Sequence, residues 1–143
     1  MNPAGFVAEQ QTVRDTQRPE RTIYAITGDG RTELYDWMRE LVARPREEYP
    51  HFGVALSLLA VLSPAEAAEL LTQRLAALAA QAQEVRALLG RAADDGVLWV
   101  FLAEEEYRLA VLEAEHRFVT TLITSLADPD YERTWRQFME GPT

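Results

Sequence analysis

The sequence predicts a mainly α protein with a small β-hairpin at its N-terminus. Three observations predict this fold class. Residues 6–13 and 21–27 have the alternating and β-branched patterns of strands. Two later segments carry apolar residues at heptad spacing. A Ser-Pro-Ala-Glu sequence starting at Ser63 marks the beginning of a long helix. We therefore expect a partial domain over residues 1–44 and a helical domain over residues 45–143.

The composition excludes several classes of protein. The chain has 143 residues, of which 48% are hydrophobic, so it can bury a core. Its formal charge of −9 argues against an unspecific polyanion binder, whose affinity would come from basic surface. The absence of Cys excludes disulfide scaffolds and thiolate metal sites. No apolar run is long enough for a membrane span and no signal peptide is visible, so we expect a soluble cytoplasmic protein.

The N-terminal part reads as two antiparallel strands, residues 6–13 and 21–27, joined by a polar loop that contains Pro19. A lone hairpin is marginal in water, so it needs a surface to pack on. A helix of roughly three turns follows, because one apolar face recurs at helical spacing. Its members are Leu34, Trp37, Met38 and Leu41. Pro45 and Pro50 interrupt it.

The next helices are predicted from apolar spacing and from helix-end signals. Residues 52–62 are apolar almost all round, which predicts a helix buried on most sides. Gly90 and residues 94–96 should end the helix that begins after Ser63. A further long helix is predicted over residues 97–127, since Asp128-Pro129 then stops it. Tyr131, Trp135, Phe138 and Met139 suggest a last short helix.

The two long helices, joined by a short turn, predict an antiparallel helical hairpin. Each helix is apolar over more than one narrow stripe, so we infer a partner chain, with a two-fold homodimer as the commonest solution. The heptad seam supplies the residues expected at the dimer contact. These are Leu71, Leu75, Leu78, Val85, Leu109, Leu112, Val119 and Ile123.

Polar residues of the helical domain give no sign of catalysis, of a cofactor or of a metal site. His51 and His116 lack the spaced partners of a metal or acid–base site, and His116 lies on an apolar row where a core or interface role is expected. The run of residues 104–106 is read as a solvated acidic face. Helical spacing also allows Glu104 to pair with Arg108 and Glu113 with Arg117. No Ser lies in a nucleophile context, so we expect no enzyme.

One segment resembles the PadR family of transcriptional regulators. The family's pattern for its wing and the following helix falls on Arg21, Tyr24, Ile26, Thr27, Gly30 and Leu34. The capped helix after Ser63 and the second long helix are similar to the virulence-activator type of C-terminal domain found in many PadR-like proteins. The resemblance covers nearly the whole chain, but it begins at the wing, and family members carry a helix-turn-helix before that point. It implies that the N-terminal hairpin is a winged-helix remnant.

The resemblance implies a transcriptional regulator, or its wing and dimerisation portion, that binds duplex DNA as a homodimer when the helix-turn-helix is present. Arg14, Arg18 and Arg21 would then contact DNA phosphates, and the alternative is a solvated loop. Trp99 and Phe101 would hold a small aromatic effector or form dimer core. The alternative function is a helical dimerisation protein that binds no DNA.

Overall fold

The structure is a computed structural model that describes residues 7–13, 21–26, 28–48 and 50–141. The chain divides into two compact units, Met1–Tyr49 and Pro50–Thr143. The sequence predicts a boundary after residue 44, and the units separate a few residues further on, between Tyr49 and Pro50. Each unit is described by itself.

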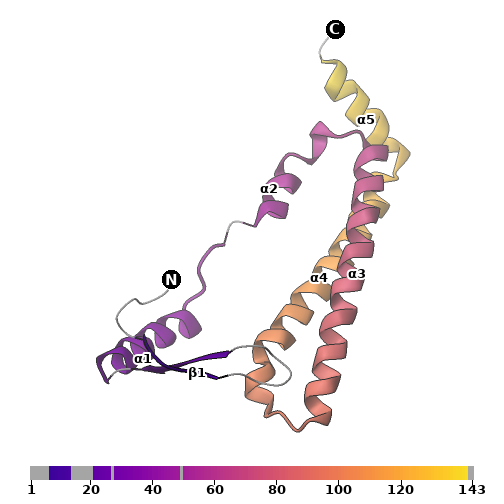
Figure 1. The fold of residues 1–143 in the computed structure, drawn as a ribbon. Coiled ribbons are helices and arrows are strands. Elements are labelled where there is room, and N and C mark those ends of the chain that lie inside the picture. Colours follow the sequence, from indigo (N-terminus) through magenta and orange to yellow (C-terminus); the bar gives the residue numbers. More distant parts are fainter. Residues whose placement is uncertain (1–6, 14–20, 27, 49, 142–143) are drawn as a thin grey trace. The chain divides into compact units, whose positions relative to one another are not determined.

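The N-terminal unit contains strands β1 (Val7–Val13) and β2 (Arg21–Ile26). They pair antiparallel, from Val7 opposite Ile26 to Val13 opposite Arg21, with an irregularity between Glu9 and Gln11 (Figure 1). Among the described residues these strands pair with each other alone. A two-stranded ribbon cannot enclose a core.

The predicted fold class therefore needs a correction. The chain is mainly α, because helices account for nearly all of the described residues outside this ribbon. A winged helix needs several helices around its strands, whereas the described part of the N-terminal unit has one helix, α1 (Gly28–Ala43). The prediction of a winged-helix remnant is therefore not supported as a fold class. Apolar alternation reveals local strand character but not the domain that surrounds it.

Helix α1 leaves much of its apolar side exposed. Tyr35, Met38, Leu41 and Val42 are all exposed, whereas Leu34 and Trp37 are half-buried. Residues 45–48 follow without regular secondary structure, as the two prolines predicted.

The segment after Pro50 differs from its prediction. It forms the short helix α2 (His51–Ser57) and the 3₁₀ turn η1 (Leu59–Val61) instead of one helix over residues 52–62. The break lies at Leu58, whose φ of −114° and ψ of 15° depart from helical values. None of these residues is fully buried, so the prediction of burial on most sides was wrong. An apolar composition alone does not supply a surface that covers every side.

Helix α3 (Pro64–Asp94) begins as the sequence predicts. Ser63 Oγ accepts a hydrogen bond from the Glu66 backbone N–H at 3.2 Å, and Pro64 occupies the first turn. The helix continues through Gly90, which does not end it. A glycine inside a long helix costs about 1 kcal/mol relative to Ala, too little to stop one that is packed along its length. The chain turns instead at Gly96, whose φ is +72°.

The predicted helix over residues 97–127 is also two elements. The 3₁₀ turn η2 (Trp99–Leu102) precedes α4 (Ala103–Leu126). No capping side chain lies at Leu98 or Leu102, whereas three glutamates occupy the first turn of α4, where the positive end of the helix dipole favours them. The last helix, α5 (Pro129–Glu140), follows Asp128, whose carboxylate accepts a hydrogen bond from the Asp130 backbone N–H.

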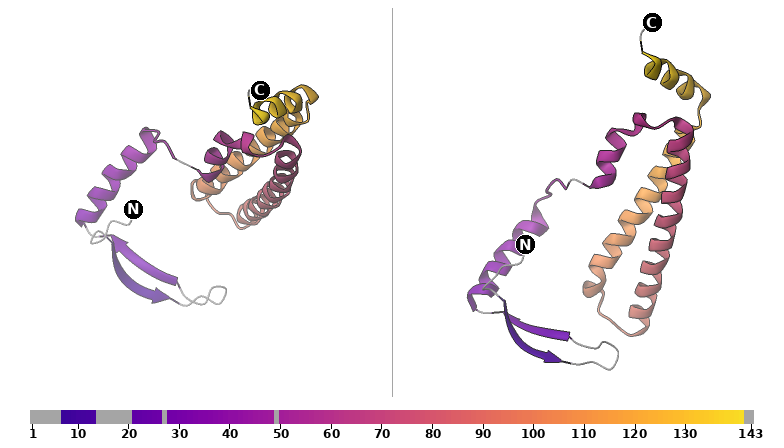
Figure 2. Two further views of the ribbon diagram at one scale, coloured as in Figure 1. Left: turned by 90° about the horizontal axis from the view of Figure 1, so that it is seen from above. Right: turned by 45° about the horizontal axis from the view of Figure 1, so that its top comes forward.

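Helices α3 and α4 lie side by side and antiparallel, and α5 lies at the end of the hairpin where α3 begins (Figures 1 and 2). Their contact is the core of this unit. Its buried apolar members are Ala67, Leu71, Leu78, Ala82, Val85, Leu112, Val119 and Leu126. Among the described residues, no helix is both long and apolar enough to cross a membrane.

Candidate functional site

The heptad seam lies inside one chain. Of the residues predicted at a dimer contact, Leu71, Leu78, Val85, Leu112 and Val119 are buried between α3 and α4, and Leu75, Leu109 and Ile123 pack against them half-buried. Val119 has no exposed surface at all, and Val85 is 2% exposed. A side chain that its own chain already covers has no area to offer to a second chain. The structure therefore assigns the five buried residues to the hairpin core. A dimer contact through the half-buried Leu75, Leu109 and Ile123 stays a prediction.

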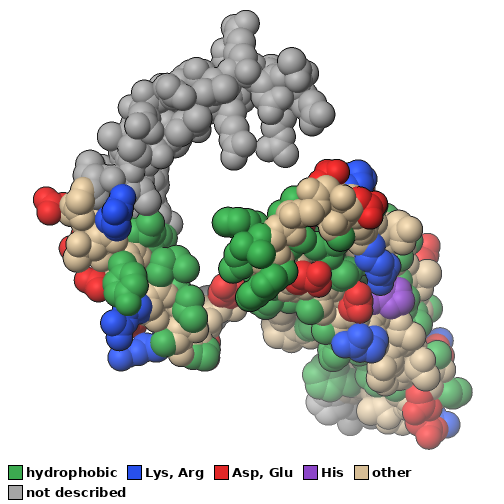
Figure 3. Space-filling model, turned by 90° about the horizontal axis from the view of Figure 1, so that it is seen from below, with side chains coloured by type: hydrophobic (Ala, Val, Ile, Leu, Met, Phe, Trp, Pro, Cys, Tyr) green, Lys and Arg blue, Asp and Glu red, His purple; other side chains and the backbone are tan. Residues whose placement is uncertain are grey.

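A second row on α4 remains uncovered. Tyr107, Val111 and Phe118 are exposed and lie four and then seven residues apart, which places them on one side of the helix. The turn between the long helices adds Val97, Leu98 and Val100, which are also exposed. Figure 3 views the molecule from the side of this turn and shows hydrophobic side chains at the surface of the helical unit. We call Tyr107, Val111 and Phe118 the α4 stripe.

Trp99 and Phe101 lie at the same end of the hairpin. They are 74% and 78% exposed, and both belong to η2, the turn between the long helices. Neither lines a described pocket. Their exposure leaves them accessible either to a flat ligand or to another chain, so both predicted roles stay predictions.

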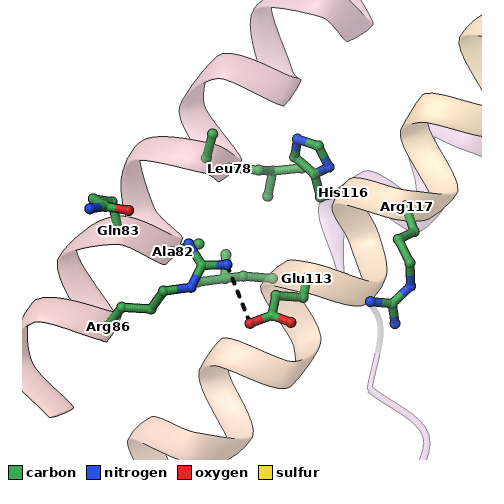
Figure 4. Close-up of a pocket in the computed structure, with 9 residues that line it drawn as sticks. Leu78, Ala82, Gln83, Arg86, Glu113, His116 and Arg117 are labelled. Atoms are coloured by element: carbon green, nitrogen blue, oxygen red, sulfur yellow. Dashed lines mark hydrogen bonds and ion pairs between the residues drawn. The ribbon is translucent and has the colours of Figure 1, made fainter. Parts of the chain in front are cut away.

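A groove of about 340 Å³ lies between α3 and α4. Leu78, Ala82 and Leu112 form its apolar floor. Gln83, Arg86, Glu113, His116 and Arg117 provide its polar lining. Figure 4 shows Arg86 reaching from α3 toward Glu113 on α4, with a dashed line that marks their ion pair and none drawn to Arg117. The groove combines an apolar floor with charges of both signs, a lining that can hold a small amphipathic molecule or the side chain of a partner.

The ion pairs along α4 differ from those that helical spacing allowed. Glu113 pairs with Arg86 of α3 at 3.4 Å and not with Arg117. Arg108 pairs with Glu105 at 3.8 Å and not with Glu104. Both expected pairs were wrong, because a partner on the neighbouring helix, or three residues away, lies closer than the one four residues away. The acidic run is only partly a solvated face, since Glu105 is half-buried.

The two histidines do not assemble a metal site. His51 is exposed at the start of α2, and His116 is half-buried at the groove. In the part of the chain that the structure describes, no group of three or more His, Asp or Glu side chains is placed to hold a metal ion.

The arginines predicted to contact DNA fall mostly outside the described residues. Arg14 and Arg18 lie in the segment 14–20, which is not described. Arg21 is the first residue of β2 and pairs with Val13 across the ribbon. The predicted phosphate contacts therefore stay predictions.

One polar cluster of the helical unit joins residues that the sequence pattern does not bring together. The Arg74 guanidinium of α3 pairs with the Glu115 carboxylate of α4, with Nε 2.7 Å from Oε2 and Nη2 3.2 Å from Oε1. The ring of Phe52, on α2, lies over the same guanidinium at 3.6 Å. Three elements thus meet at one side chain. Local spacing could not reveal this, since Arg74 and Glu115 are 41 residues apart.

The comparisons with known proteins support the fold. A crystal structure of Bacillus subtilis PadR in complex with operator DNA superposes with a TM-score of 0.65, at 17% identity, over 85% of this chain and 71% of that chain. The fold is PadR-like. No family model matches the chain, and no curated protein matches it. A PadR-like fold agrees with the resemblance that the sequence predicted, and the low identity limits the agreement to architecture.

Proposed function

We propose that the chain is a PadR-like transcriptional regulator that acts in the cytoplasm and binds duplex DNA as a homodimer. The observation that carries the proposal is the likeness in fold to PadR, which was solved with operator DNA. The likeness extends over 85% of the chain, so it includes more than a generic helical hairpin.

The distribution of charge favours the N-terminal unit as the DNA-binding part. Residues 1–49 contain seven arginines against nine acidic residues, whereas residues 50–143 contain seven against fourteen. DNA phosphates repel an acidic surface, so the less acidic unit is better suited to approach them. Arg14, Arg18 and Arg21 are the side chains that we assign to phosphate contacts in this proposal.

The exposed apolar surface of the helical unit favours a second copy as partner. The α4 stripe and the turn η2 with Trp99 and Phe101, called the aromatic turn below, expose large apolar side chains. Surfaces of this kind commonly mark association sites. In a two-fold dimer the same stripe would meet its own copy, so no other protein needs to be invoked. The buried residues of the seam stay inside each protomer.

The test is DNA binding measured together with the oligomeric state. Light scattering on the eluted protein should give twice the chain mass. Selection from a pool of random duplexes should enrich one sequence with two-fold symmetry, and its affinity should fall steeply with salt. Replacing Arg14 and Arg18 together by Gln should lower affinity and reduce the salt slope by up to about two.

A matched double variant controls for the loss of charge, and two outcomes would contradict the proposal. The matched control replaces Arg133 and Arg136 of α5 by Gln, which removes the same charge from the helical unit and should leave the salt slope unchanged. A dimer that enriches no duplex at any salt would refute the regulator and support a helical dimerisation protein. A monomer would refute the dimeric part of the proposal.

A further inference from the structure

We propose that Arg74 is a positioning residue that holds residues 51–62 against the helical hairpin and so fixes the point from which the N-terminal unit is tethered. Residues 51–62, which comprise α2 and η1, are called the strap below. The holding of the strap is independent of any DNA binding, whereas its regulatory consequence rests on the proposed function.

The strap has little stability of its own. Helix α2 has seven residues and no side-chain cap at Pro50, and none of its residues is fully buried. Isolated helices of this length do not persist in water, because the cost of the first turn is not recovered. The order of the strap must therefore come from its contacts with the rest of the helical unit.

The first contact is at the N-terminal end of the strap. The Arg74 guanidinium lies over the face of the Phe52 ring, with Cζ 3.6 Å from the ring centroid. Nε and Nη2 of the same guanidinium donate hydrogen bonds to the two carboxylate oxygens of Glu115. The Arg74 and Glu115 side chains are 37% and 24% exposed, so the pair is partly removed from water and its geometry is bidentate. A guanidinium that Glu115 holds in one orientation offers Phe52 a fixed platform.

The second contact is at the C-terminal end of the strap. Trp135 Nε1 of α5 donates a hydrogen bond to the Ala60 carbonyl at 2.8 Å. Leu59 and Leu62 pack against the core at this end. The strap is thus attached at both ends, and Arg74 is the attachment next to the N-terminal unit.

Arg74 holds the end of the strap from which the chain leads to the N-terminal unit. From Phe52 the chain runs back through Pro50 to residues 45–48, which have no regular secondary structure. The contact of Phe52 with Arg74 therefore fixes the end of the chain segment that leads to residues 45–48. Because Glu115 lies on α4, a shift of α4 against α3 would move the Arg74 platform and release or tighten the strap. In the proposed regulator, an event on the hairpin would reach the DNA-binding unit by this route.

Hydrogen exchange of the full chain tests the holding function. Arg74→Gln should raise amide exchange in residues 52–58 at least tenfold, with α3 and α4 unchanged near the middle of the hairpin. Glu115→Gln should do the same to a smaller extent, because the guanidinium remains but is less fixed. Phe52→Leu, which keeps apolar bulk without a ring face, covers the case in which Arg74→Gln fails to fold.

The matched control is Arg86→Gln, since Arg86 also pairs across the hairpin, with Glu113, and lies at a groove whose lining includes no strap residue. Its exchange in residues 52–58 should equal that of the unaltered chain. Equal exchange in Arg74→Gln and the unaltered chain, or an equal rise in Arg86→Gln, would overturn the proposal.

A distance measurement between two spin labels tests the tether. The sequence has no Cys, so the labels attach at the introduced positions alone. Asp36→Cys on α1 and Gln81→Cys on α3, both exposed positions, carry one spin label each. Adding Arg74→Gln should broaden the distance distribution, and adding Arg86→Gln should not. An unchanged distribution would refute the tether. Neither readout uses DNA, so a failure of the proposed function would show in the binding assay and leave these results interpretable.

Discussion

Arg86 of α3 donates to Glu113 of α4 across 3.4 Å and thereby links the two long helices at the edge of their groove. Within α4, helical spacing would have paired Glu113 with Arg117. The pair is half-exposed on both sides, so water screens it. The pair therefore adds little to the stability of the fold, and its main effect is on the shape of the groove that both residues line.

Removing this pair should change stability little. Arg86→Gln should lower the free energy of unfolding by about 1 kcal/mol or less, since exposed ion pairs contribute about 0–1 kcal/mol. Urea unfolding monitored by circular dichroism measures the difference. A loss of several kcal/mol would contradict the view that the Arg86–Glu113 pair is solvent-screened.

A core substitution about two turns away on α3 should behave differently. Leu78 is buried in the seam, and Leu78→Ala should lower the free energy of unfolding by about 2–5 kcal/mol. The same urea experiment checks this value. Leu88→Ala on the same helix, at an exposed position, is the control and should cost far less. If the dimer rather than the protomer core used Leu78, the loss would vanish at low protein concentration.

The start of α3 should depend on one hydroxyl. Ser63→Ala removes the acceptor for the Glu66 backbone N–H and should cost about 0.5–2 kcal/mol. Ser63→Asp should restore most of the stability, because its carboxylate can also accept this hydrogen bond. Thermal unfolding of the three proteins under one condition gives the comparison. Equal stability of the Ala and Asp variants would show that the cap is not made in solution.

The α4 stripe should control association without controlling the fold. Phe118→Glu should turn the dimer into a monomer, because two carboxylates would meet in the contact, while helical content stays the same. Light scattering and circular dichroism measure the two properties. Thr124→Glu, at an exposed position outside the stripe, should remain dimeric. A dimeric Phe118→Glu protein would place the contact elsewhere.

Trp99 should report on aromatic ligands. An amphipathic aromatic dye such as anilinonaphthalene sulfonate should quench tryptophan fluorescence in a saturable way if the exposed aromatic turn binds flat molecules. Trp99→Phe should abolish that part of the quenching, whereas Trp135→Phe should preserve it. Linear quenching without saturation would indicate collisions and remove the predicted effector role from Trp99 and Phe101.

The sequence predicted the helix ends that local chemistry fixes. Ser63 and Pro64 start α3, because a cap and a proline act within one turn. Asp128 and Pro129 were predicted to stop the second long helix, and α4 ends just before them at Leu126. It failed where ends depend on what lies beside the chain. Gly90 did not stop α3, and residues 97–102 did not join α4.

The candidate sites follow the same division. The heptad spacing correctly marked Leu78 and Val85 as part of one apolar row on α3 and Val119 as part of another on α4. Spacing cannot say whether the row that faces each of them belongs to the same chain or to another. The cluster of Phe52, Arg74 and Glu115 left no local pattern, because its members come from three elements.

The sequence by itself determined the mainly helical character, the acidic charge and the resemblance to PadR. These depend on composition, on helical spacing and on the order of short motifs, all of which are local in the chain. The tertiary structure alone decided that the seam is the protomer core, that the α4 stripe is uncovered and that Arg74 joins the strap to the hairpin. Burial and pairing are relations between distant residues, and the close packing of α3 on α4 sets them.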